Sequence, residues 1–203
     1  MKERPINLRD WEVRAILDDR KTQLRRVVKP QPDHFHRDIV GKEKPYATED
    51  WNRIIPQLGD DEIPCPYGSP GDRMWVREAW QDYCPIWNGH WCGHGTQEGI
   101  ERDHTPVYRA DNGWISPKRW RPSIHMPRWA SRITLEVVSV RVERVQEIGE
   151  EDATAEGVAF TKYANASARF HFREIWDSIN AARGFGWDAN PWVWVVEFRR
   201  VAT

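Results

Sequence analysis

The stretch ITLEVVSVRVERV at residues 133–145 carries the clearest β-strand signal in the chain. Its apolar side chains alternate from Ile133 to Val137 and then continue on the opposite phase from Val138 to Val142. Alternation with a period of two predicts a strand that buries one face. Because the phase slips by one residue, we predict a β-bulge or bend near Val137, a device that barrels use to turn corners.

Shorter helices and strands are expected on either side of this strand. Apolar spacing predicts helices at about 8–19, 150–156 and 167–180, and strands at about 20–28, 73–80, 106–110 and 192–200. Turn residues separate these strands, without regular βαβ alternation. This order favours an α+β, mainly β protein, a small β-barrel with flanking helices, over a Rossmann sheet. The segments at about 31–64 and 82–127 are predicted to be two long loop insertions in a single domain spanning residues 1–203.

The composition excludes several classes of protein. The 203 residues hold 30 Lys and Arg against 31 Asp and Glu, so a globally basic nucleic-acid coat is excluded, although a local basic patch is not. The 13 tryptophans argue against a disordered chain. Three cysteines are an odd number, which disfavours a disulfide framework. No apolar run approaches the ~20 residues of a membrane span and no secretory signal is recognisable, so we expect a cytoplasmic protein without a membrane partner.

The order of four segments resembles the ASCH domain, a member of the PUA-like β-barrel superfamily. These segments are the helix that leads into Arg20-Lys21-Thr22, the turn and strand Gly71-Asp72-Arg73-Met74-Trp75-Val76, the helix at 150–157, and the final strand Trp192–Arg200. Two further motifs, Trp129-Ala130-Ser131-Arg132 and Asp188-Ala189-Asn190-Pro191, are similar to the longer ASCH proteins of phages and prophages. The resemblance covers a little over half of the chain. It implies a pseudo-β-barrel whose cleft acts on RNA, nucleotides or modified nucleosides.

The resemblance also implies candidate catalytic residues. A small bacterial member of the family is an amidohydrolase that removes the acetyl group of N4-acetylcytidine, with a Lys and a Thr on one strand and a Glu on the helix after the long strand. The Lys matches Lys21 and the Glu matches Glu156, which would act as a base and as an orienting group. The Thr position falls on Leu24, whose side chain has no oxygen. Thr22 is the candidate substitute, on the same face of an extended strand but displaced by about 7 Å.

A basic set of residues is the candidate nucleic-acid interface. We expect phosphate contacts from Arg20, Arg25, Arg26, Lys118, Arg119, Arg121, Arg128 and Arg132. Trp120 and Trp129 lie among them in the sequence and are expected to stack on bases. The segment 118–132 has no acidic residue, which supports this interpretation. The alternative is that these residues form an ordinary solvated charged face.

Three functions follow from these observations. The chain is expected to bind RNA, or a modified nucleoside or nucleotide, in a basic cleft. The alternatives are an amidohydrolase of the N4-acetylcytidine type and a ribonuclease in which Lys21 and nearby arginines stabilise a pentavalent phosphate. No cofactor is expected. No metal is expected either, because the candidate ligands Cys84, His90, Cys92, His94 and His104 match no zinc-site spacing.

Overall fold

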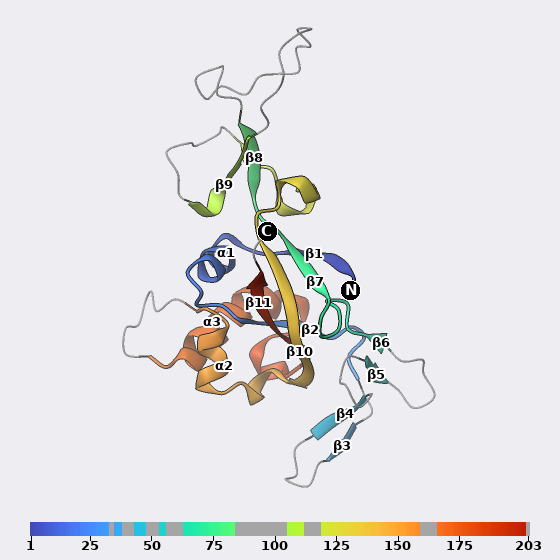
Figure 1. The fold of residues 1–203 in the computed structure, drawn as a ribbon. Helices are drawn as coiled ribbons and strands as arrows, with labels where there is room; N and C mark the ends of the chain where they lie inside the picture. Colours follow the sequence, from blue (N-terminus) through green and yellow to red (C-terminus); the bar gives the residue numbers. More distant parts are fainter. Residues whose placement is uncertain are drawn as a thin grey trace, which may run out of the picture.

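The computed structural model describes residues 1–32, 35–37, 43–47, 53–55, 63–83, 105–111, 119–158 and 166–201, and its main element is a five-stranded sheet (Figure 1). Across the sheet, the strands are β1 (Glu3–Asn7), β7 (Arg73–Arg77), β10 (Thr134–Arg144), β11 (Trp192–Val201) and β2 (Gln23–Val27). β1 pairs with β7 in parallel, and the other neighbours are antiparallel. The prediction of an α+β, mostly β protein is confirmed. Within the described part of the chain, the sheet is not closed into a barrel, since β1 and β2 form its two edges.

Strand β10 contains the predicted bulge. Its pairing with β11 shifts register between Val137 and Ser139, which leaves Val138 as the extra residue. Val138 is 51% exposed, whereas Val137 and Val140 are buried. The bulge therefore turns both halves of the strand toward the same core, and this explains why the apolar pattern changes phase in the sequence. The predicted β-bulge near Val137 is confirmed.

Helices flank the sheet, as predicted. They are α1 (Asp10–Leu17), α2 (Glu150–Ala155) and α3 (Ala168–Asn180). Short 3₁₀ turns occupy η2 (Arg109–Asp111), η3 (Ser123–His125), η4 (Arg128–Ala130), η5 (Val145–Glu147), η6 (Ala181–Arg183) and η7 (Trp187–Ala189). In Figure 1, α2 and α3 lie side by side below α1. The site described below is formed where these three helices approach β2.

Strand β11 is buried on both faces. Trp194 packs in a cluster that includes Ile16 of α1, whereas Val195 packs in a second cluster with Phe172 of α3. Consecutive residues of a strand point to opposite faces, so one strand can contribute to two cores. This explains why the run from Trp192 to Phe198 is almost continuously apolar rather than alternating.

Six short strands lie outside the main sheet in the described residues. β3 (Phe35–Arg37), β4 (Glu43–Ala47), β5 (Arg53–Ile55) and β6 (Ile63–Pro64) form an antiparallel sheet, and β8 (Trp80–Tyr83) pairs with β9 (Thr105–Tyr108). In Figure 1 the first sheet projects to the lower right and the β8–β9 pair projects upward. Strand β9 corresponds to the strand predicted at about 106–110, whereas the four strands β3 to β6 were not predicted within the segment 31–64. Each strand spans two to five residues, too few for a periodic pattern to stand out.

Candidate functional site

Lys21 and Glu156 meet in the interior although they are 135 positions apart in the chain. Their backbones form an isolated antiparallel bridge. Lys21 Nζ donates to Glu156 Oε2 at 2.8 Å and to the Glu156 carbonyl oxygen at 2.9 Å. The Lys21 side chain is fully buried, and that of Glu156 is 5% exposed. The structure thus brings together the two residues that the family resemblance singles out as a pair.

This bridge depends on the places where two helices end. α1 ends at Leu17, and Lys21 N then donates back to the carbonyl oxygen of Ala15 at 3.0 Å. α2 ends just before Glu156, and Gly157 follows with a φ of 74°. A Cβ at residue 157 would lie 2.7 Å from the Cβ atoms of both Ala15 and Lys21. Glycine permits this close approach, so the end of α2 packs directly on the connection between α1 and β2.

Arg25 completes a buried ion network around Glu156. Its Nη1 lies 3.2 Å from Glu156 Oε1, so Lys21 and Arg25 each occupy one oxygen of the carboxylate. Its Nη2 lies 2.6 Å from Glu143 Oε1 and 2.7 Å from Asp152 Oδ2. The Arg25 side chain is fully buried, and buried charges are tolerated when they are paired. The network therefore holds the Glu156 carboxylate in one position.

Glu12 is a second buried carboxylate beside Lys21. Its Oε1 lies 3.9 Å from Lys21 Nζ and 3.2 Å from Arg26 Nη2, and its Oε2 accepts a hydrogen bond from the Arg9 backbone at 2.9 Å. Burial alone would raise the pKa of Glu12, but the charges of Arg26 and Lys21 and the Arg9 hydrogen bond together lower this pKa below its ordinary value. The centre of the Trp11 ring lies 5.5 Å from Lys21 Nζ, which adds a cation–π attraction. Glu12 is therefore an anion at neutral pH.

A cavity of about 410 Å³, which we call the first cavity, lies beside this network. Its wall includes the aromatic rings of Trp11, Phe172 and Trp176 and the charged residues Arg9, Glu12, Arg25, Arg26, Glu156 and Arg183. Among the described residues, Glu156 lines this cavity and Lys21 does not. Glu156 is thus the member of the pair that a bound molecule would meet. Sites for small molecules have volumes of about 300–1,000 Å³, and this cavity falls in that range.

Leu24 and Thr22 do not share one environment. Leu24 is fully buried and belongs to the core cluster of Ile16 and Trp194. Thr22 is exposed, because β2 begins only at residue 23. In the described part of the chain, no hydrogen bond joins the Thr22 hydroxyl to Lys21 or Glu156. The expectation that Thr22 and Leu24 lie on one strand face is therefore wrong, and neither residue supplies a hydroxyl to the first cavity.

Carboxylates from elsewhere in the chain neutralise part of the basic set. Arg132 lies 2.9 Å from Glu78 and 2.7 Å from Asp111, and Arg128 lies 3.2 Å from Glu3. The segment 118–132 thus contains no acidic residue itself, but acidic residues from elsewhere in the chain pair with its arginines. Arg25 is enclosed in the network around Glu156 and is not part of an exposed basic face.

The other members of the set have different neighbours. Arg20 pairs with Asp18 at 2.9 Å, Arg26 and Arg121 line cavities, and Arg119 is exposed. Trp129 is 58% exposed and meets Trp80 edge to face, with ring centres 5.7 Å apart. Lys118 lies outside the described residues, as do Cys84, His90, Cys92, His94 and His104.

Several site residues were missed from the sequence. Glu12, Glu143 and Asp152 look like ordinary surface acids there, and Phe172 and Trp176 look like the core stripe of a helix. One signal was present, because Lys21, Gln23 and Arg25 are polar at every second position, a pattern that marks a second, polar strand face. That face meets α2, where it is buried and paired rather than solvated.

Two general properties concern the described residues only. No group of three or more His, Cys, Asp or Glu side chains there is arranged to hold a metal ion. No helix in that part of the chain is both long enough and apolar enough to cross a membrane.

Comparison with known proteins assigns no family to this chain. No protein-family model, no curated protein and no solved structure matches it. Its function must therefore be inferred from the geometry of the site.

Proposed function

We propose that this chain is a PUA-like ASCH protein that binds a modified nucleoside or nucleotide, free or within RNA, in the first cavity between α1, β2 and α3. The observation that carries the proposal is the wall of this cavity, where aromatic rings, two buried glutamates and several arginines face one space. A nucleotide offers a planar base, polar base edges and an anionic phosphate. Each of these has a counterpart in the wall.

The aromatic and acidic residues suit a base. Trp11 is partly exposed at the cavity, and aromatic rings stack on bases with little dependence on base identity. Glu12 and Glu156 accept hydrogen bonds, and an amino group on a base edge, such as that of cytosine, donates them. Lys21 and Arg25 hold the Glu156 carboxylate in place, so its orientation is set before a ligand arrives.

The arginines suit a phosphate. Besides the enclosed Arg25, three arginines and two glutamates line the first cavity, in a chain whose net charge is −1. Arg9 and Arg183 are exposed, so their guanidinium groups are accessible from solvent. A local excess of positive charge attracts an anion even when the protein as a whole is close to neutral.

Features of the fold support the assignment to the ASCH family. α1 leads into Lys21, the bent strand β10 precedes α2, and Glu156 at the end of α2 contacts Lys21. These elements follow the order that the resemblance uses.

Binding is favoured over hydrolysis because the first cavity lacks the expected nucleophile. Leu24 occupies the Thr position and is buried in the core. The second candidate is an amidohydrolase for N4-acylated cytidine, which the 2.8 Å contact between Lys21 and Glu156 supports. Water would then be the attacking group, positioned by Glu156. A ribonuclease has less support, because Lys21 is fully buried and is not among the described residues that line the first cavity.

The test measures the affinities for cytidine, N4-acetylcytidine and cytidine 5′-monophosphate by tryptophan fluorescence and calorimetry. We expect Trp11→Leu to weaken binding about tenfold through the loss of base stacking. Arg183→Gln should weaken binding of the monophosphate but not of the nucleosides. The matched control is Trp129→Leu, because Trp129 is exposed and lies outside the residues that line the cavity. Unchanged affinities in Trp11→Leu, or no binding by the wild type, would contradict the proposal.

Chromatography of the same mixtures tests the second candidate. Release of cytidine from N4-acetylcytidine by the wild type would establish an amidohydrolase. Release that persists in Glu156→Gln would show that it takes place elsewhere.

A further inference from the structure

A second cavity, of about 580 Å³, adjoins the first. Its wall is formed by Leu8, Arg9, Asp10, Trp11, Arg14, Ala79, Arg109, Trp120, Arg121, Pro122 and Ser123. Four of these residues, Leu8, Arg9, Trp11 and Ser123, also line the first cavity. The two cavities are therefore neighbours, with Arg9 and Trp11 in the wall of both, and we refer to the two together as the recess.

Positive charge dominates this recess over its whole length. Apart from Arg25, which is enclosed in the network around Glu156, its two parts are together lined by six arginines, Arg9, Arg14, Arg26, Arg109, Arg121 and Arg183, and by three acids, Asp10, Glu12 and Glu156. The protein has almost no net charge, so this excess is local. A recess that is basic along its length fits a ligand with several phosphates better than one with a single charge.

Contacts within the protein orient the arginines of the second cavity. Arg109 Nε lies 2.6 Å from Asp10 Oδ2, and Arg14 Nη1 donates to the Ala110 carbonyl oxygen at 3.3 Å. The Arg121 guanidinium lies over the Trp80 ring, 5.2 Å from its centre. A guanidinium has five N–H donors, so the contacts of Arg109 and Arg121 described here leave donors for a phosphate. Among the described residues that line the second cavity, Asp10 is the only acid.

An aromatic ring is available in each part of the recess. Trp11 is partly exposed at the boundary, and Trp120 is partly exposed in the second cavity. Proteins that bind single strands combine a basic groove with rings on which successive bases stack. Bases that enter cavities must be unpaired, which excludes an intact duplex.

We propose that the recess binds single-stranded nucleic acid, with one base in the first cavity and the following phosphate and base in the second. The inference rests on the proposed function and extends it, because it makes an oligonucleotide the preferred ligand. Arg9 lies at the boundary, where it would contact the phosphate that links the two nucleotides. Arg121 and Trp120 would bind the second nucleotide.

The experiment measures the affinity of the purified full chain for a cytidine monophosphate, a cytidine dinucleotide, single-stranded hexamers of RNA and DNA, and an RNA duplex. We expect the dinucleotide to bind about tenfold more tightly than the monophosphate, and the duplex to bind most weakly of the oligomers. The two hexamers distinguish RNA from DNA as the source of the strand. A dinucleotide that binds no more tightly than the monophosphate would overturn the inference.

Variants of the second cavity locate the effect. Trp120→Leu and Arg121→Gln should abolish the advantage of the dinucleotide and leave the affinity for the monophosphate unchanged. Arg121→Gln should also reduce the dependence of log K on log salt by about 0.7, the value for one phosphate of a single strand. If Trp120→Leu changes no affinity while Trp11→Leu still weakens the binding of the monophosphate, the inference fails and the proposed function stands. If no nucleotide or oligonucleotide binds, both fail.

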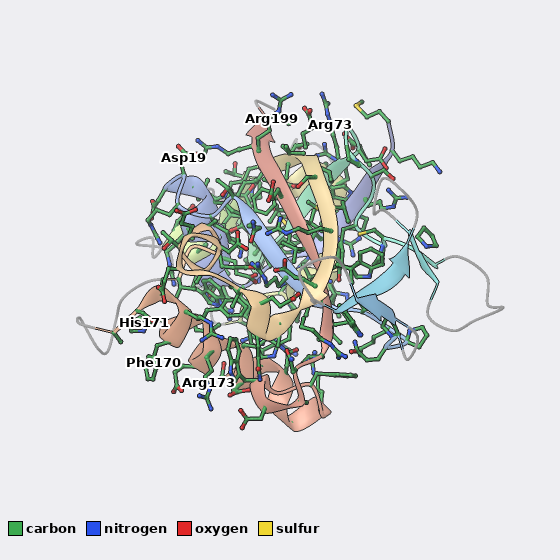
Figure 2. All side chains as sticks on the ribbon, turned by 90° about the horizontal axis from the view of Figure 1, so that it is seen from below. Asp19, Arg73, Phe170, His171, Arg173 and Arg199 are labelled. Carbon is green, nitrogen blue, oxygen red and sulfur yellow. The ribbon has the colours of Figure 1, made fainter. Side chains whose placement is uncertain are left out.

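Two control variants separate the recess from the general surface. Trp129→Leu removes an exposed ring that is close to Trp120 in the sequence but lies outside both sets of lining residues. Arg199→Gln removes an exposed charge at the far end of the molecule from α3, whose Phe170 and Arg173 are labelled in Figure 2. Neither variant should alter the advantage of the dinucleotide. If Trp129→Leu and Trp120→Leu reduce the advantage of the dinucleotide equally, the nucleic acid follows the outer surface of the protein. This result would overturn the proposal.

Discussion

The Lys21 ammonium and the Glu156 carboxylate lie 2.8 Å apart at the point where the end of α2 packs on the connection between α1 and β2. Neither side chain is more than 5% exposed, so each charge depends on its partners rather than on water. Arg25 takes the second oxygen of the carboxylate. The pair is thus a structural clamp, of which Glu156 also lines the first cavity.

The clamp predicts strong coupling between its two members. Glu156→Gln leaves two buried cations short of a partner, and we expect it to lower the free energy of unfolding by about 3–5 kcal/mol. Lys21→Met should cost a similar amount. The double variant should cost clearly less than the sum, because it removes both charges of one pair. Urea unfolding monitored by circular dichroism gives the free energies of unfolding of the wild type, the two single variants and the double variant, which together form a double-mutant cycle.

Glu136→Gln is the control for that cycle. Glu136 pairs with the exposed Arg199, and a surface pair contributes about 0–1 kcal/mol. Strict additivity of Lys21→Met and Glu156→Gln would show that the contact does not couple the two residues.

Leu24→Thr should not create an amidohydrolase. The side chain at position 24 points into the core with Ile16 and Trp194, whereas the neighbouring Arg25 points toward Glu156. A hydroxyl at position 24 would be buried away from the cavity, and we expect a loss of about 2–4 kcal/mol in the free energy of unfolding. Chromatography with N4-acetylcytidine and urea unfolding check the two parts. Release of cytidine by Leu24→Thr but not by the wild type would place residue 24 in the site.

Gly157→Ala should destabilise the protein far more than Gly184→Ala. Both glycines have a positive φ, of 74° and 80°, which costs an L-residue about 1–2 kcal/mol. A Cβ at residue 157 would overlap Ala15 and Lys21, whereas one at residue 184 would have no atom within 4 Å. We expect an additional loss of about 1–3 kcal/mol at residue 157, measured as the difference between the two unfolding free energies. Equal losses would mean that the close approach of α2 is unimportant.

Two carboxylates with lowered pKa values, Glu12 and Asp152, predict a loss of stability in acid. Burial tends to raise the pKa of Asp152, but hydrogen bonds and charges from Gln23, Arg25 and Arg141 lower it overall, and the pKa of Glu12 is lowered too. A carboxylate with a lowered pKa in the folded state adds stability above its ordinary pKa, 4.5 for Glu12 and 3.8 for Asp152. That stability is lost as the pH falls through the lower, folded value, because protonation then favours the unfolded chain.

Urea unfolding between pH 6 and about pH 3 tests this acid dependence. The midpoint of the wild type should fall with pH, and Asp152→Asn should be less stable at pH 6 but show a shallower fall. Glu151→Gln, at the exposed neighbouring position, should retain the slope of the wild type. If the urea midpoint of Asp152→Asn falls with pH as steeply as that of the wild type, the Asp152 carboxylate does not contribute to the loss of stability in acid.

Local patterns predicted much of the main sheet. The phase change at Val137 predicted the bulge, and the apolar run from Trp192 predicted β11, because burial of a strand face repeats at a fixed spacing along the chain. β1 escaped prediction since Ile6 is its only buried residue, so no repeat exists to be read. The short strands between residues 35 and 64 span two to five residues each, too few for a repeat to stand out in the sequence.

By itself, the sequence determined where the long strand bends and which helices flank it, and its family resemblance indicated Lys21 and Glu156. Only the tertiary structure decided that this pair is enclosed with Arg25, and that Glu3, Glu78 and Asp111 neutralise arginines of the basic segment. Periodicity reports which face of an element is buried. The pairing of charges depends on distances between residues far apart in the chain, and those distances exist only once the elements have packed.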